Sequence, residues 1–112
     1  MLVYAKTDIG KAREMNQDFI YVSDNLENIK LCILADGMGG YKGGEIASKL
    51  ATISAKEYLE KNIGNIDLKY ENILELIKNA MEYANMQVHK EAMKTEELDQ
   101  MGTTLEICLV IR

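Results

Sequence analysis

The sequence predicts an α+β fold, in which strands and helices are segregated along the chain. Short apolar segments rich in β-branched residues occur before residue 36 and after residue 101. Between them, apolar residues recur every three or four positions through two long segments, which is the spacing of amphipathic helices. The predicted order is strand, strand, strand, helix, helix, strand. Such an order places both helices in one layer against an antiparallel sheet.

The composition narrows the class of protein. A chain of 112 residues forms one domain at most, and a net charge of −5 disfavours a nucleic-acid or anionic-membrane partner, since both need a basic face. No segment approaches the ~20 apolar residues of a membrane span, and the N-terminus lacks the pattern of a signal peptide. Cys32 and Cys108 lie in apolar runs, so we expect buried reduced thiols and a cytoplasmic location.

Three strands are predicted in the first third of the chain. Leu2–Ala5 is the first, and a turn at Asp8–Gly10 follows it. Phe19–Val22 and Lys30–Ala35 are separated by a short polar loop, which favours an antiparallel hairpin. The run Leu31–Ala35 is uninterrupted and apolar, so we expect a strand buried on both faces.

Two helices and a last strand complete the predicted order. The first helix is expected from Glu45 to about Asn62, before a stop at Asn62–Asn65. The second is expected from Tyr70 to Lys94. Its apolar stripe comprises Ile73, Leu74, Ile77, Ala80, Met81, Ala84 and Val88. The β-branched run Gly102–Ile111 is the last strand. Because an apolar strand at a terminus would be an exposed edge, we expect residues 1–112 to be the front part of a larger domain.

Asp36 and the glycines after it form the first candidate site. The carboxylate follows a buried run directly, and five glycines lie within residues 37–44. A buried strand ending in a carboxylate favours a cationic partner, and glycines allow close approach of the backbone to a ligand. The Asp36 carboxylate and the Gly37 carbonyl are hard oxygen ligands, which suit Mg²⁺ or Mn²⁺ better than Zn²⁺. The alternative is a tight turn, for which Asp-Gly is a common signal.

Nucleotide-binding loops do not fit this stretch. A phosphate-binding P-loop requires Gly-Lys followed by Ser or Thr, whereas Lys42 is followed by Gly43. A dinucleotide fingerprint requires glycine at position 42. An Asp-x-Gly-x-Gly motif counted from Asp36 has Met38 where its first glycine should be. The spacing of the residues therefore excludes all three nucleotide-binding motifs.

A second candidate site precedes the second strand. If the second and third strands pair antiparallel, Asp18 at the start of one lies near Asp36 at the end of the other. Arg13 offers a planar guanidinium that can bind a phosphate bidentately. The alternative for this segment is a solvated polar loop. Elsewhere, Met101–Thr104 is interpreted as a close-packing segment, and His89 as a surface histidine rather than a catalytic base.

With these residues assembled, the chain resembles the bacterial form of the PPM family, also called PP2C, of metal-dependent protein serine/threonine phosphatases. The matching pieces are Asp8–Gly10 with Arg13, then Asn16–Asp18, Ala35–Ser48 and Met101–Thr104. The resemblance implies that the chain is part of an αββα sandwich, two antiparallel sheets flanked by helix pairs, with two Mn²⁺ or Mg²⁺ ions in its cleft. It also implies phosphorylated protein substrates and an opposing serine/threonine kinase.

The resemblance implies roles for individual residues. Asp36 would bridge both metals and Gly37 would offer its carbonyl to one of them. Arg13 would bind the substrate phosphate, and Asp18 would orient a metal-bound water. Gln17 stands where some family members have Glu.

The family's later acidic motifs, with their metal ligands, fall beyond Arg112. Hard cations of this kind want ~6 oxygen ligands, so we expect phosphatase activity only in the complete domain. The alternative is a catalytically inactive truncated phosphatase that binds a partner through its open sheet edge.

Overall fold

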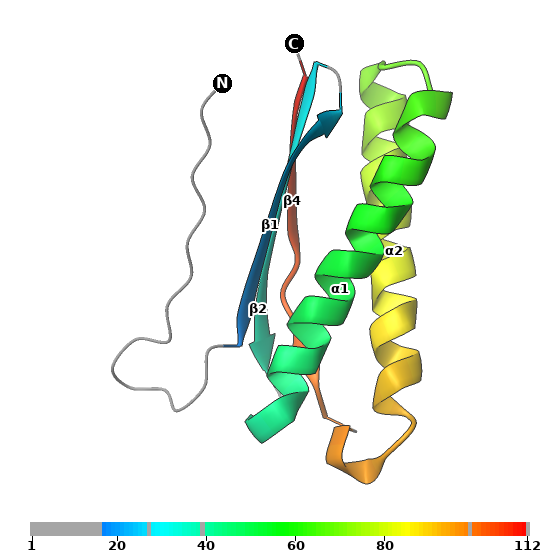
Figure 1. Ribbon diagram of the computed structural model, residues 1–112. Coiled ribbons are helices and arrows are strands. Elements are labelled where there is room, and N and C mark those ends of the chain that lie inside the picture. Colours follow the sequence, from blue (N-terminus) through cyan, green and yellow to red (C-terminus); the bar gives the residue numbers. More distant parts are fainter. Residues whose placement is uncertain (1–16, 27, 39, 99, 112) are drawn as a thin grey trace.

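Two long helices pack on one face of an antiparallel sheet in a computed structural model that describes residues 17–26, 28–38, 40–98 and 100–111 (Figure 1). The predicted first strand, Leu2–Ala5, lies outside the described residues. The elements are β1 (Asp18–Leu26), β2 (Ile29–Met38), α1 (Gly40–Asn62), α2 (Tyr70–Ala92), β3 (Gly102–Thr103) and β4 (Glu106–Ile111), with 3₁₀ turns η1 (Ile63–Asn65) and η2 (Glu96–Leu98). The predicted α+β class is confirmed.

Strand β2 is the centre of the sheet. It pairs antiparallel with β1 on one side and with β3 and β4 on the other. The predicted hairpin of the second and third strands is therefore confirmed. Its turn contains Asn28 at a φ of 61°, a left-handed conformation that asparagine tolerates better than most residues.

The expected end of the central strand before Asp36 is wrong. Asp36 and Gly37 lie inside β2, which continues to Met38 because Gly37 pairs with Thr103 and Met38 with Gly102. These partners come from a distant part of the chain. The last predicted strand, 102–111, is divided into β3 and β4. Both pair with β2, and residues 104 and 105 separate them.

The central strand is buried on one face only, so the expectation of burial on both faces is wrong. Leu31, Ile33 and Ala35 point toward the helices and are fully buried, whereas Leu34 is 39% exposed on the other face. Both helices cover the same side of the sheet (Figure 1). The two cysteines, which were expected to be buried, are also more exposed than predicted. Both are free thiols, but Cys32 is half-buried and Cys108 is exposed.

Helix α1 begins at Gly40, five residues before the predicted start, and ends at Asn62 as predicted. Its buried face carries small residues, among them Ala47, Ala51 and Ala55. The edge strand of the described sheet, β1, is tied to this helix, because the Tyr21 hydroxyl of β1 donates a 2.7 Å hydrogen bond to Oε1 of Glu60.

Helix α2 is confirmed, although it ends at Ala92 rather than Lys94. Ala80, Ala84 and Val88 are buried as predicted. Leu74 is 55% exposed, so its place in the predicted stripe is wrong, and the buried leucine is Leu76. The buried positions of α2 recur every fourth residue along the side that meets α1 and the sheet. Small residues at such a contact allow two helices to approach closely.

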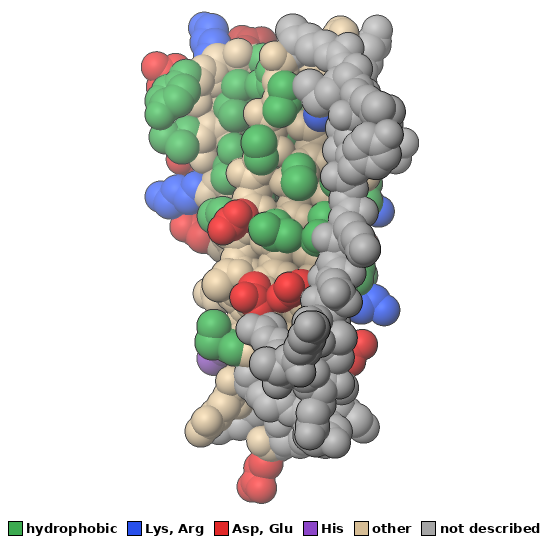
Figure 2. All heavy atoms as spheres, turned by 90° about the vertical axis from the view of Figure 1, so that its left-hand side faces the viewer, with side chains coloured by type: hydrophobic (Ala, Val, Ile, Leu, Met, Phe, Trp, Pro, Cys, Tyr) green, Lys and Arg blue, Asp and Glu red, His purple; other side chains and the backbone are tan. Residues whose placement is uncertain are grey.

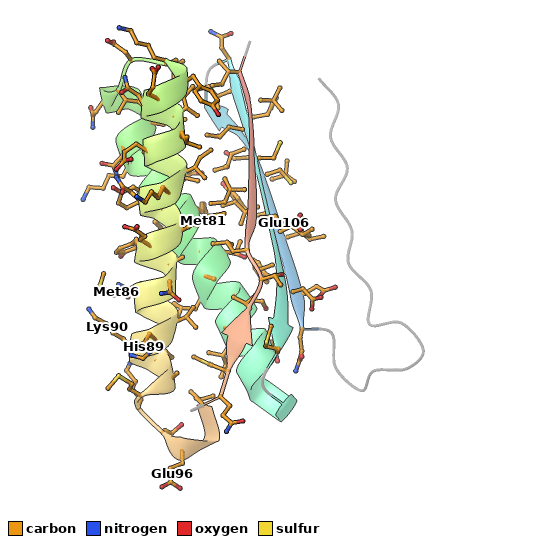
Figure 3. All side chains as sticks on the ribbon, turned by 180° about the vertical axis from the view of Figure 1, so that it is seen from behind. Met81, Met86, His89, Lys90, Glu96 and Glu106 are labelled. Atoms are coloured by element: carbon orange, nitrogen blue, oxygen red, sulfur yellow. The ribbon has the colours of Figure 1, made fainter. Side chains whose placement is uncertain are left out.

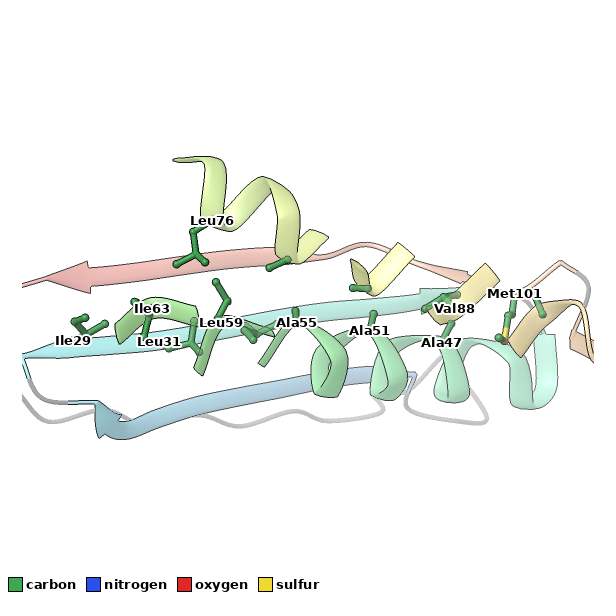
Figure 4. Packing of buried hydrophobic residues seen from close by; sticks show 14 of the residues in the cluster. Ile29, Leu31, Ala47, Ala51, Ala55, Leu59, Ile63, Leu76, Val88 and Met101 are labelled. Carbon is green, nitrogen blue, oxygen red and sulfur yellow. The ribbon is translucent and has the colours of Figure 1, made fainter. Parts of the chain in front are cut away.

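The core lies between the two helices and β2 (Figure 4). Among its buried members are Ile29, Leu31, Ile33, Ala47, Ala51, Leu59, Ile63, Leu76, Ala84, Val88 and Met101. None of the helices in the described part of the chain is long and apolar enough to span a bilayer.

Candidate functional site

The sheet face turned away from the helices is here called the open face. The register places on it seven apolar side chains, Ile20, Val22, Cys32, Leu34, Met38, Cys108 and Val110, and four charged ones, Asp18, Lys30, Asp36 and Glu106. Figure 2 shows hydrophobic side chains gathered across this face, with acidic ones among them. Glu106, labelled in Figure 3, lies opposite Leu34 of β2.

Asp18 and Asp36 are direct partners across β1 and β2. Both side chains therefore lie on the open face, and directly opposed residues have Cβ atoms about 4.5–5.5 Å apart. Asp18 is half-buried, with its Oδ1 atom inaccessible to solvent, and Asp36 is exposed. The expectation that pairing brings these two carboxylates together is confirmed.

Thr104 holds the backbone of Asp36 from the other side. The Asp36 N–H donates a 3.0 Å hydrogen bond to Oγ1 of Thr104, and the Thr104 N–H donates a 2.9 Å bond to the Asp36 carbonyl. Both main-chain groups of Asp36 are thus used by one residue. The sequence interpretation of Met101–Thr104 as a packing segment did not foresee this contact. The threonine was visible in the sequence, but no local pattern links it to Asp36.

The glycines near Asp36 serve close packing of α1 against the sheet. A Cβ atom built on Gly37 would lie 1.9 Å from the carbonyl oxygen of Gly44. One built on Gly44 would lie 2.5 Å from Cδ of Gln17, and one on Gly43 would lie 2.9 Å from Cβ of Met101. These glycines allow the first turns of α1 to lie directly on the end of β2. The helix therefore starts earlier than a glycine-rich sequence suggests.

The Gly37 backbone faces β1. Its N–H donates a 3.0 Å hydrogen bond to the Gln17 carbonyl. In an extended strand, the N–H and C=O of one residue point toward the same neighbouring strand, so the Gly37 carbonyl also faces the β1 side, where Asp18 begins the strand. Three of the expected site residues, Asp18, Asp36 and Gly37, are therefore neighbours at one end of the β1–β2 pair. Arg13, expected to bind phosphate, lies outside the described residues.

A cavity of about 330 Å³ lies between α2 and the segment 101–105. Its polar lining includes Asn85, His89 and Thr103, and neither Asp18 nor Asp36 borders it. His89 lies on α2, as Figure 3 shows, and is exposed. The cavity is separate from the carboxylate pair, in agreement with the interpretation of His89 as a surface residue.

The donor set fits a hard divalent cation. Two like charges directly opposite each other on adjacent strands repel, and a cation bound to both relieves that repulsion. Carboxylate and carbonyl oxygens are the ligands that Mg²⁺ and Mn²⁺ prefer. Within the described ranges, no group of three or more His, Cys, Asp or Glu side chains converges on one point. The described side chains alone therefore do not form a complete ligand set for such a cation.

The match to a known protein family covers nearly the whole chain. The family model for protein phosphatase 2C matches residues 10–112. The chain belongs to the protein phosphatase 2C family. Among curated relatives, a "Putative protein phosphatase 2C-type" of Streptococcus pyogenes is 35% identical over 112 residues, which cover 99% of this chain and 44% of that protein. "Protein phosphatase PhpP" of Streptococcus pneumoniae is 33% identical over 94% of this chain and 41% of its own.

Solved structures of protein phosphatase 2C relatives have the same fold. The S. agalactiae serine/threonine phosphatase superposes with a TM-score of 0.79 at 30% identity, over 96% of this chain and 43% of that one. The Mycobacterium tuberculosis serine/threonine phosphatase PstP/Ppp gives a TM-score of 0.74 at 32% identity, over 95% and 40%. The chain thus spans less than half the length of these relatives, and corresponds to their N-terminal portion.

Proposed function

We propose that this chain is the N-terminal part of a single phosphatase domain that hydrolyses phosphoserine and phosphothreonine in cytoplasmic proteins, opposite a serine/threonine kinase. The observation that carries the proposal is the direct pairing of Asp18 with Asp36, in a chain that belongs to a phosphatase family. The pairing places two carboxylates on the open face, beside the backbone of Gly37.

The proposed cofactors are two Mn²⁺ or Mg²⁺ ions, held here by Asp36 and by the Gly37 carbonyl. When bound, such ions act as Lewis acids that lower the pKa of water and neutralise charge at phosphorus. Asp36 supplies negative charge at a position fixed through its backbone by Thr104. Asp18 lies opposite and is partly withdrawn from solvent, so it can accept a hydrogen bond from water and orient it. Arg13 is proposed to bind the substrate phosphate.

Manganese titration of the purified chain tests the placement of the site. We expect binding in calorimetry, with Asp36→Asn and Asp18→Asn each weakening it at least about tenfold, because the first removes the anionic ligand and the second removes the negative charge directly opposite it. Glu106→Gln is the matched control, since it removes one negative charge from the same face at a different place. Equal effects of all three substitutions would mean that Mn²⁺ responds only to overall charge, and the proposed site would be wrong.

Turnover of p-nitrophenyl phosphate tests whether the chain lacks metal ligands that the activity requires. One carboxylate and one carbonyl leave two cations far short of ~6 ligands each, so the 112-residue chain should hydrolyse this substrate poorly or not at all. Brisk Mn²⁺-dependent turnover that Asp36→Asn abolishes would show that the chain alone is sufficient.

A second candidate function is partner binding without catalysis. It is favoured by the exposed apolar residues of the open face, with Leu34 39%, Met38 55% and Val110 39% exposed. A chain that binds no Mn²⁺ at all would favour this candidate over the phosphatase.

A further inference from the structure

Gln17 contacts both elements that meet beside the carboxylate pair, the end of β2 and the start of α1. Its main-chain carbonyl accepts a 3.0 Å hydrogen bond from the Gly37 N–H. Its side chain lies against Gly44 of α1, because a Cβ atom built on Gly44 would lie 2.5 Å from Cδ, 2.6 Å from Oε1 and 2.9 Å from Nε2 of Gln17. One residue thus joins a proposed metal ligand to the helix.

The Gln17 side chain lies on the opposite side of the sheet from the two carboxylates. Successive residues of a strand point to opposite faces, and Asp18 points to the open face with Asp36. Gln17 therefore points toward α1, in agreement with its contact with Gly44, and it is half-buried there. The contact lies between the sheet and its helix layer, so it does not depend on what covers the open face. This placement makes Gln17 a neighbour of the proposed metal site rather than one of its ligands.

Gly44 has a structural reason to be glycine. Alanine is more favourable than glycine inside a helix, but the space that an alanine methyl group would take is occupied by the Gln17 amide. The carbonyl oxygen of Gly44 in turn lies so close to Gly37 that a Cβ atom on Gly37 would overlap with it. Gln17, Gly37 and Gly44 are therefore packed together, and a shift of one moves the other two.

We propose that Gln17 is a positioning residue of the metal site, whose contact with Gly44 fixes the start of β1 against the end of β2. The proposal rests on the proposed phosphatase function, which makes Asp36 and Gly37 metal ligands. Gly37 is held from the β1 side by Gln17, and Asp36 is held from the other side by Thr104. Asp18 follows Gln17 directly, so the same contact fixes the carboxylate opposite Asp36. Such support affects affinity because Mg²⁺ demands near-ideal placement of its ligands.

An exchange of volume between positions 17 and 44 tests the contact. Gln17→Ala should weaken Mn²⁺ binding to the purified chain about tenfold in calorimetric titration, because the start of β1 loses its support on α1. The double variant Gln17→Ala/Gly44→Ala places a methyl group where the amide was, and should restore the affinity to within about threefold of the wild type. The proposal is overturned if Gln17→Ala leaves the affinity unchanged. It is also overturned if the double variant binds no better than Gln17→Ala, since an amide that acted as a ligand could not be replaced by a methyl group.

Hydrogen exchange of the Gly37 amide provides a second readout, which needs no metal. Its rate is compared with that of the Leu31 amide in the buried part of β2, because the ratio of the two rates cancels changes in overall stability. The ratio should rise at least about tenfold in Gln17→Ala and return toward the wild-type value in the double variant. An unchanged ratio in Gln17→Ala would contradict the role of Gln17. Failure of the wild type to bind Mn²⁺ would instead contradict the proposed function, so the two failures are distinguishable.

Tyr21→Phe is the matched control. It removes another link between β1 and α1, the 2.7 Å hydrogen bond from the Tyr21 hydroxyl to Glu60, but at a point further along β1. We expect its Mn²⁺ affinity to stay within about twofold of the wild type, with an unchanged ratio of the Gly37 and Leu31 exchange rates. If Tyr21→Phe changes both readouts as much as Gln17→Ala does, any loosening of β1 is sufficient and Gln17 has no specific positioning role.

Discussion

Thr104 hydrogen-bonds to both main-chain groups of Asp36, although the two residues are 68 positions apart in the sequence. The Thr104 hydroxyl accepts from the Asp36 N–H at 3.0 Å, and the Thr104 N–H donates to the Asp36 carbonyl at 2.9 Å. These bonds fill the short gap between β3 and β4. They fix the part of β2 from which the Asp36 carboxylate projects.

Replacement of Thr104 tests this contact. Thr104→Val keeps the shape of the side chain but removes the acceptor of the Asp36 N–H, so we expect a loss of about 1 kcal/mol in the free energy of unfolding. Thr104→Ser keeps the hydroxyl and should lose less. Urea unfolding measures both, and calorimetric titration with Mn²⁺ should show weaker binding for the valine variant than for the serine variant. If valine and serine behave alike in both measurements, the hydroxyl does not position Asp36.

Gly37 should not accept even the smallest side chain. In Gly37→Ala, the added Cβ would lie 1.9 Å from the main-chain oxygen of Gly44, which cannot rotate away. We expect a loss of more than about 3 kcal/mol, because α1 would have to move away from β2. Gly64→Ala is the control, since a Cβ at Gly64 meets no atom within 4 Å, and its effect should stay within about 0.5 kcal/mol. Similar midpoints for both variants in thermal unfolding would contradict the close approach.

Two buried hydroxyls on α1 should respond in opposite directions. Thr52 is 1% exposed, and its Oγ1 has no hydrogen-bond partner among the described residues. Thr52→Val should therefore raise the free energy of unfolding by about 1 kcal/mol, since the unsatisfied hydroxyl is replaced by a methyl group. Ser48 is equally buried, but its Oγ donates a 3.2 Å bond to the Glu45 carbonyl, so Ser48→Ala should lower stability by about 0.5–1 kcal/mol. Urea unfolding of both variants decides whether they differ in sign.

The pKa of Cys32 predicts a loss of stability in alkali. Burial, and secondly Cys108, raise this pKa above its ordinary value of 9.0. Above that value the unfolded chain loses the Cys32 proton before the folded chain does, so the free energy of unfolding falls as the pH rises toward the folded pKa. Lys30 and Glu106 are the charged neighbours on the same face, and Val22 lies opposite on β1.

Reducing conditions are needed for this measurement. Urea midpoints between about pH 8 and about pH 10 should fall more steeply in the wild type than in Cys32→Ala. Cys108→Ser should show an intermediate slope, because it removes the smaller of the two causes. Parallel profiles for all three proteins would show that Cys32 does not contribute.

The local order of the chain determined much of the fold. Apolar residues spaced three or four positions apart predicted the bounds of α2 to within two residues. The asparagine and glycine after residue 61 predicted the end of α1. The polar loop between two apolar runs predicted the β1–β2 hairpin, and with it the approach of Asp18 to Asp36. These features depend on neighbours in sequence, whose periodicity and turn chemistry are visible in a single chain.

The tertiary structure decided the rest. The extension of β2 through Asp36 and Gly37 depends on hydrogen bonds from residues 102–104, and the early start of α1 depends on the glycine contacts with β2. Which face of the sheet is buried depends on where the helices lie, so an apolar run alone cannot tell one buried face from two. The opposition of Cys32 and Cys108 likewise exists only through the β2–β4 register. Contacts between distant residues are set by packing of the whole chain, and no local pattern encodes them.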